Sequence, residues 1–68
     1  MQYTAIVKND DDWWYGWIEE VPGVNCQEKS HDELLETLRI SLIEALEFNK
    51  NDAISSAGQG FKEEIIAV

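Results

Sequence analysis

Carboxylates are the most numerous groups that could carry chemistry in this 68-residue chain. Fourteen Asp and Glu residues stand against five Lys and Arg, which gives a formal net charge of −9. The acidic run 10–12 lacks the alternating spacing and the later bidentate glutamate of a calcium-binding loop. Glu19 and Glu20 are neighbours in an expected strand, so they point to opposite faces and do not form a carboxylate pair. A magnesium-dependent, RNase H-type nuclease using Asp10, Asp12 and Glu19 therefore has little support.

The chain has one histidine and one cysteine. We expect His31 to lie half-buried on the core side of a helix, satisfied by the backbone, and Cys26 to be a packed strand residue. A single cysteine forms no disulfide within the chain, and no Cys/His cluster offers a zinc site. The glycines form no phosphate-binding motif. The sequence therefore predicts a protein that is not an enzyme and uses no cofactor or metal.

The excess of negative charge indicates the kind of partner. Binding to a nucleic-acid backbone requires clustered Lys and Arg, whereas the five basic residues here are scattered along the chain. We therefore expect no direct nucleic-acid binding. A basic protein is the natural complement, because opposite fields speed encounter and select partners. The alternative is that the protein is simply acidic and soluble.

Membrane and export signals are not expected. No apolar run approaches the roughly 18–20 residues of a membrane span, and the first residues lack a basic n-region and an apolar h-region. A lone free cysteine fits a reducing compartment. The sequence predicts a cytoplasmic protein without membrane contact.

Residue patterns predict the order β-β-β-α-β. A turn cluster at 9–12 and the Val21-Pro22-Gly23 breaker separate three strands of an antiparallel meander. Ser30 and Glu33 form the pattern of a capping box, so a helix should begin there and end near residues 48–50. The strands are expected at 3–8, 13–19 and 24–28, and a closing strand at 61–68.

These elements define a single small α+β domain over residues 1–68. One helix packs on one face of the meander, and the closing strand returns beside the first strand, because a helix between two strands permits a parallel right-handed connection. The expected core face of the helix is a stripe at helical spacing. It consists of His31, Leu34, Leu35, Leu38, Leu42, Ala45 and Leu46.

The second strand carries apolar side chains on both faces. Trp13, Tyr15 and Trp17 share one face, and Trp14 and Ile18 share the other. A single helix covers only one of these faces, so aromatic surface is left for a second layer. The alternative is that the aromatic residues wrap the sheet edge within one chain. A chain this short also gains support from oligomerisation or from docking on a partner.

The stretch from Trp14 to Gln27, followed by Ser30–Leu34 and an amphipathic helix, resembles the HicB family, the antitoxins of type II toxin–antitoxin modules. The Pro22-Gly23-Val24 turn, Gln27 and the capped helix carry the resemblance by their order and spacing. With the opening strand and residues 61–65, it covers nearly the whole chain. Glu28 stands where the family commonly has glycine, so that turn is expected to be built differently.

The resemblance implies a partial RNase H-like fold without the nuclease's catalytic carboxylates. Such antitoxins bind a small basic HicA-type toxin, an mRNA-cleaving ribonuclease, and block its active site. Many relatives carry a C-terminal DNA-binding domain, which is not expected within these 68 residues. The alternative is a stand-alone homo-oligomeric structural or regulatory module, a dimer or tetramer, without a toxin.

Both functions require a contact surface. We expect it to consist of the aromatic strand with its acidic neighbours, together with an isoleucine ringed by carboxylates on the helix. The residues of this predicted surface are Trp14, Tyr15, Trp17, Glu19, Glu20, Glu36, Ile40 and Glu44.

Overall fold

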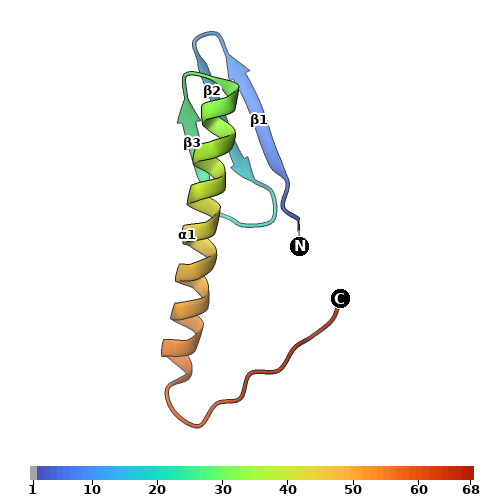
Figure 1. Cartoon of the computed structure of the whole chain (residues 1–68), viewed down its shortest axis with the longest axis vertical. Helices are drawn as coiled ribbons and strands as arrows, with labels where there is room; N and C mark the ends of the chain where they lie inside the picture. The colour runs from blue at the N-terminus through green and yellow to red at the C-terminus, as the bar shows by residue number, and fades with distance from the viewer. Residues whose placement is uncertain (1) are drawn as a thin grey trace.

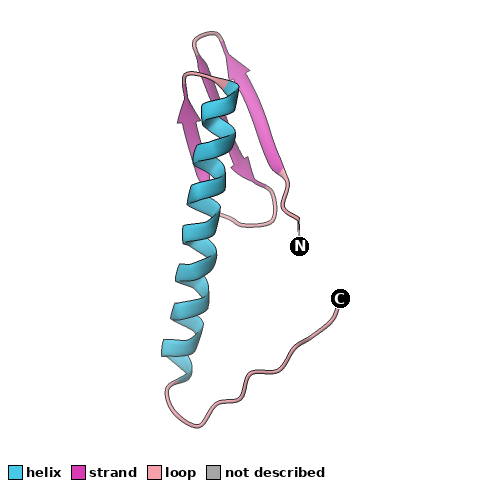
Figure 2. Cartoon of the chain, in the orientation of Figure 1, coloured by secondary structure: helices cyan, strands magenta, loops and turns pink. Residues whose placement is uncertain are grey.

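A three-stranded antiparallel sheet packed against one long helix makes up the fold (Figure 1). The computed structural model describes residues 2–68. The sheet order is β1-β2-β3, and both strand pairs are antiparallel, so the predicted α+β meander is confirmed. Figure 2 shows the helix on one side of the strands and an irregular segment after it. The elements are β1 (Ala5–Asp10), β2 (Trp13–Ile18), β3 (Asn25–Glu28) and α1 (His31–Ala57).

Both turns of the meander form where the sequence predicted them. Asp11 adopts a positive φ of 49° between β1 and β2, and the Asn9 side-chain amide donates to the Trp13 carbonyl at 3.2 Å. Asn and Asp favour such turns because their short polar side chains bond nearby backbone. In the β2–β3 connection, Gly23 has a φ of 91°, which glycine tolerates without a steric penalty. The turns fix the register that pairs Ile6 with Trp17.

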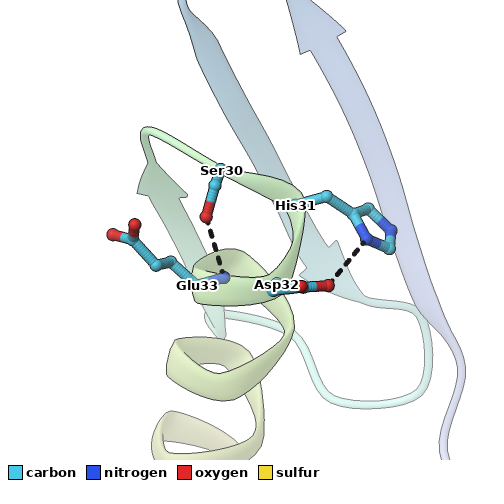
Figure 3. A network of polar contacts seen from close by, with 4 residues as sticks. All are labelled: Ser30, His31, Asp32 and Glu33. Carbon is cyan, nitrogen blue, oxygen red and sulfur yellow. Dashed lines mark hydrogen bonds and ion pairs between the residues drawn. The ribbon is translucent and has the colours of Figure 1, made fainter.

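Helix α1 begins at the predicted cap. The Ser30 hydroxyl accepts a hydrogen bond from the Glu33 backbone N–H at 3.2 Å (Figure 3). Asp32 and Glu33 place negative charge in the first turn, where the helix dipole favours it. Figure 3 shows the Glu33 carboxylate extending outward from the helix, so the structure shows the Ser30 half of the predicted capping box.

The end of α1 was predicted at least about two turns too early. The helix continues beyond residues 48–50 to Ala57, and Gly58, with a φ of 68°, donates its N–H to the Ser55 carbonyl. Asn49 and Asn51 suggested termination, but both remain in the helix, which ends at Gly58, whose positive φ glycine adopts without a steric penalty. The lower half of α1 therefore extends beyond the sheet (Figure 1).

The core is small and lies between the sheet and the first half of α1. Its buried apolar residues come from β2, the β2–β3 connection and the helix, and part of the predicted helix stripe, Leu42, Ala45 and Leu46, packs at its margin. Leu35 and His31, also predicted to face the core, are exposed at the edge of that stripe. The buried set is Ile18, Val21, Val24, Leu34 and Leu38.

The predicted closing strand is not formed in this structure. Residues 59–68 have no regular secondary structure, and every one of them is exposed. Because α1 runs on to Ala57, the chain leaves the helix far from β1, and the strand order stops at three. The observed architecture is therefore β-β-β-α, and the closing strand of an RNase H-like fold is not part of it.

No helix within residues 2–68 combines the length and the apolar composition that crossing a membrane requires.

Candidate functional site

The face of the sheet that α1 leaves uncovered carries a row of aromatic side chains. Alternation along β2 directs Trp13, Tyr15 and Trp17 away from the helix, because Trp14 and Ile18 pack on the helix side. Across the β1–β2 pair, Ile6 lies opposite Trp17, and this extends the row toward the edge of the sheet. Trp17 is 40% exposed and Trp13 38%. We call this row, with Ile6, the uncovered sheet face.

Two of the five basic residues lie on the aromatic rings of this face. The Lys29 ammonium is 4.3 Å from the centroid of the Trp13 ring. The Lys8 ammonium is 5.9 Å from the centroid of Tyr15, its cross-strand neighbour. Cations are attracted to the electron-rich faces of such rings, at a strength of about 0.5–1 kcal/mol at exposed sites. The rings are therefore able to receive a cationic side chain on their faces.

Carboxylates lie at both ends of the aromatic row. The β1–β2 turn contributes Asp11 and Asp12 beside Trp13, and Glu19 and Glu20 follow directly after β2 at the opposite end. All four residues are exposed. The uncovered sheet face thus combines an apolar aromatic centre with acidic ends, the usual distribution of a protein-binding surface, with its apolar centre and polar rim.

Glu20 also has a structural contact. Its Oε1 accepts a hydrogen bond from the Thr4 backbone N–H at 2.8 Å, and the Glu19 backbone N–H donates to the Thr4 carbonyl at 2.9 Å. The hydrogen bond from Thr4 stabilises the ionised carboxylate and lowers the pKa of Glu20 below its ordinary value. Glu20 therefore fastens the start of the chain to the β2–β3 connection, in addition to its predicted place in a contact surface.

Trp14 lies on the opposite, helix-covered face. It is partly buried against the core, and its ring meets His31 edge-on, with centroids 5.0 Å apart. His31 was predicted to be half-buried and satisfied by the backbone. Its side chain is instead 48% exposed, and Nδ1 lies 3.7 Å from the Asp32 carboxylate. Trp14 is therefore a packing residue, and it does not lie on the uncovered sheet face with Tyr15 and Trp17.

The helix residues of the predicted surface also lie apart from the aromatic row. Glu36, Ile40 and Glu44 are exposed, whereas Leu34 and Leu38 turn the other side of α1 toward the sheet. The helix and the sheet therefore separate Ile40 from the uncovered sheet face. A partner lying flat on the sheet cannot reach these three residues, so the predicted set divides between two sides of the molecule.

Two polar contacts join β3 to α1. The Thr37 hydroxyl donates to the Glu28 carboxylate at 2.8 Å, and Cys26 Sγ lies 3.5 Å from the Ser41 hydroxyl. Cys26 is half-buried against the helix, in agreement with the packing role predicted for it. The side chain of Glu28 thus holds the helix against β3.

The carboxylates do not converge on a metal site in the described part of the chain. No cluster of three or more His, Cys, Asp or Glu residues suited to a metal occurs within residues 2–68. Asp12 and Glu19 flank β2 at its two ends, and six strand residues at about 3.3 Å each separate them. The arrangement thus does not bring Asp10, Asp12 and Glu19 together.

The sequence-based surface omitted Trp13, Ile6 and the two lysines. Strand alternation already grouped Trp13 with Tyr15 and Trp17, so the signal for Trp13 was present in the sequence. Lys29 follows β3 at the position opposite Trp13, because the β2–β3 register pairs Trp14 with Glu28, so its place over the ring depends on that register. In comparisons with known proteins, no family model, no curated protein and no solved structure matches this chain.

Proposed function

We propose that this protein is an antitoxin-like binding protein that masks a small basic toxin of the HicA type, an mRNA-cleaving ribonuclease. The observation that carries the proposal is the uncovered sheet face, with an exposed aromatic centre and carboxylates at both ends. Its support from the sequence is the net charge of −9 and the resemblance of Trp14–Leu34 to the HicB family. The cytoplasm, where mRNA is translated, is the proposed location.

The proposed mechanism is steric and electrostatic masking. The flat rings of Tyr15 and Trp17 bury a large area with little loss of side-chain freedom. Arginines of a basic partner replace Lys8 and Lys29 over the rings, and further cations pair with Asp12 and the other acidic end residues. A partner held in this way has its RNA-binding charges covered, so it is inhibited without any catalysis by the antitoxin.

The closing strand of a partial RNase H-like fold belongs to the same proposal. The resemblance implies that residues 61–68 pair beside β1, whose outer edge faces no other strand in the sheet of the described chain. An extended, exposed segment with Ile65, Ile66 and Val68 has the composition to add such a strand. We propose that this strand forms in the assembled state of the protein.

Light scattering of the purified protein, with and without the small basic protein encoded next to it, tests the function. The proposal predicts a complex, inhibition of RNA cleavage by that protein, and loss of both in Trp17→Ala. As a matched control, Ile40→Ala removes an exposed apolar side chain from the other side of the molecule and should bind like the wild type. A neighbouring product that is not basic, or that stays unbound, contradicts the proposal.

A stand-alone homo-oligomeric module is the second candidate. The observation in its favour is the small core, with five buried apolar residues among residues 2–68. Light scattering of the isolated protein separates the two candidates. An oligomer in which Trp13 and Trp17 are already protected from solvent, and which binds no basic protein, supports the module over the antitoxin.

A further inference from the structure

Helix α1 is longer than the sheet that supports it. At about 1.5 Å per residue, its 27 residues span about 40 Å, and from Glu47 onward every side chain is exposed. Figure 1 shows this lower half of the helix without a strand beside it. A helical segment without packing contacts is stabilised only by its intrinsic helix propensity, which is weak. The helix is nevertheless complete up to its C-cap at Gly58, so we expect a packing partner for this segment.

The outer surface of α1 has a regular stripe. Its positions alternate in steps of three and four residues, the spacing with which two helices pack along a shared seam. Ile40 and Ile43 are each 47% exposed and Ile54 is 36% exposed, so the apolar members are accessible. The stripe consists of Ile40, Ile43, Glu47, Lys50, Ile54 and Ala57.

This stripe is complementary to itself when a second copy runs in the opposite direction. Pairing about a midpoint between residues 48 and 49 places Ile43 against Ile54 of the second copy. The same register places Glu47 against Lys50 of the second copy, and the two-fold axis repeats both contacts. A parallel pairing in register would instead oppose Glu47 to Glu47 and Lys50 to Lys50. The order of charges along the stripe therefore favours the antiparallel pair.

We infer that the chain forms an antiparallel homodimer through this helix stripe. The dimer uses the side of the molecule away from the uncovered sheet face. It is therefore independent of the proposed toxin contact, and both surfaces are available in one assembly.

Charge reversal tests the helix pairing by analytical ultracentrifugation of the full chain without any other protein. Wild type should sediment as a dimer, and Glu47→Lys or Lys50→Glu alone should weaken dimerisation at least tenfold. An equimolar mixture of the two variants, and the double variant, should restore it. Asp52→Lys makes the same charge change on the opposite side of the helix and should leave the dimer intact. A monomeric wild type, or single variants that dimerise normally, overturns the inference.

The ultracentrifugation contains no toxin, so its failure is distinct from failure of the proposed function.

Discussion

At the scale of single residues, Glu20 illustrates how a predicted contact residue has a second role. Its carboxylate accepts the Thr4 backbone N–H and is fully exposed to solvent. Thr4 lies just before β1, and its carbonyl accepts the Glu19 backbone N–H at 2.9 Å. A charge-assisted hydrogen bond at this position ties the start of the chain to the loop after β2.

The Glu20 contact predicts a dependence of stability on pH. Because folding lowers the pKa of Glu20, the contact stabilises the fold above the ordinary glutamate pKa and is lost as pH falls from there through the lowered pKa of the folded state. Glu20→Gln should therefore reduce the loss of stability over that range. Urea unfolding at several pH values measures this. Glu19→Gln leaves the Thr4 contact intact, so equal behaviour of the two variants would contradict the assignment.

Ser30 supports a second prediction at the residue scale. Its hydroxyl satisfies one of the free N–H groups at the start of α1, so Ser30→Ala should lower the free energy of unfolding by about 1 kcal/mol. Ser30→Asp keeps an acceptor at the cap and should retain most of the stability. Chemical denaturation of the three proteins gives the comparison, and an unchanged midpoint in Ser30→Ala would show that the cap is not needed.

At the scale of elements, the helix both completes the core and extends beyond it. Leu34 and Leu38 are the two fully buried side chains, and both come from the first half of α1. The sheet contributes Ile18 from β2, with Val21 and Val24 from the connection that follows. The packing between the sheet and the helix therefore depends mainly on the two helical turns that contain Leu34 and Leu38.

Leu38→Ala should destabilise the protein by about 2–5 kcal/mol, because it opens a cavity in a core that has few other residues to fill it. That cost is comparable to the whole stability of a domain of this size, at about 0.05–0.15 kcal/mol per residue. Phe48→Ala removes a larger side chain that is 69% exposed and should cost less than 1 kcal/mol. Thermal unfolding followed by circular dichroism measures both. Similar losses in the two variants would be inconsistent with the observed core.

The elements themselves were largely predictable from the sequence, whereas their ends and assembly were not. Strand alternation and turn residues gave the meander, and the Ser30 cap gave the helix start. The helix end depended on whether Asn49 and Asn51, or Gly58, terminated it. The helix propensities that decide between these ends differ by only a few tenths of a kcal/mol per residue. Because the helix is longer than predicted, residues 61–68 lie away from β1. The predicted contact residues also lie on two sides of the molecule, because helix residues such as Ile40 lie on the side opposite Trp17.

At the scale of the whole molecule, the chain presents two independent surfaces. The uncovered sheet face has an aromatic centre between acidic ends, and the outer side of α1 has a self-complementary stripe of isoleucines and paired charges. A small core and a long exposed helix are consistent with a protein that is most stable when assembled. Binding at the sheet face is the proposed function, and pairing of the helices is the inferred assembly.

The three tryptophans offer built-in reporters for the central claim. Trp13 and Trp17 lie on the uncovered sheet face, and Trp14 lies on the helix-covered face against the core. Their indole N–H protons give separate NMR signals that can be followed while the neighbouring basic protein is added. The account predicts that the Trp13 and Trp17 signals shift or broaden on binding while that of Trp14 stays nearly unchanged. A complex that perturbs Trp14 alone, or none of the three indoles, would contradict it.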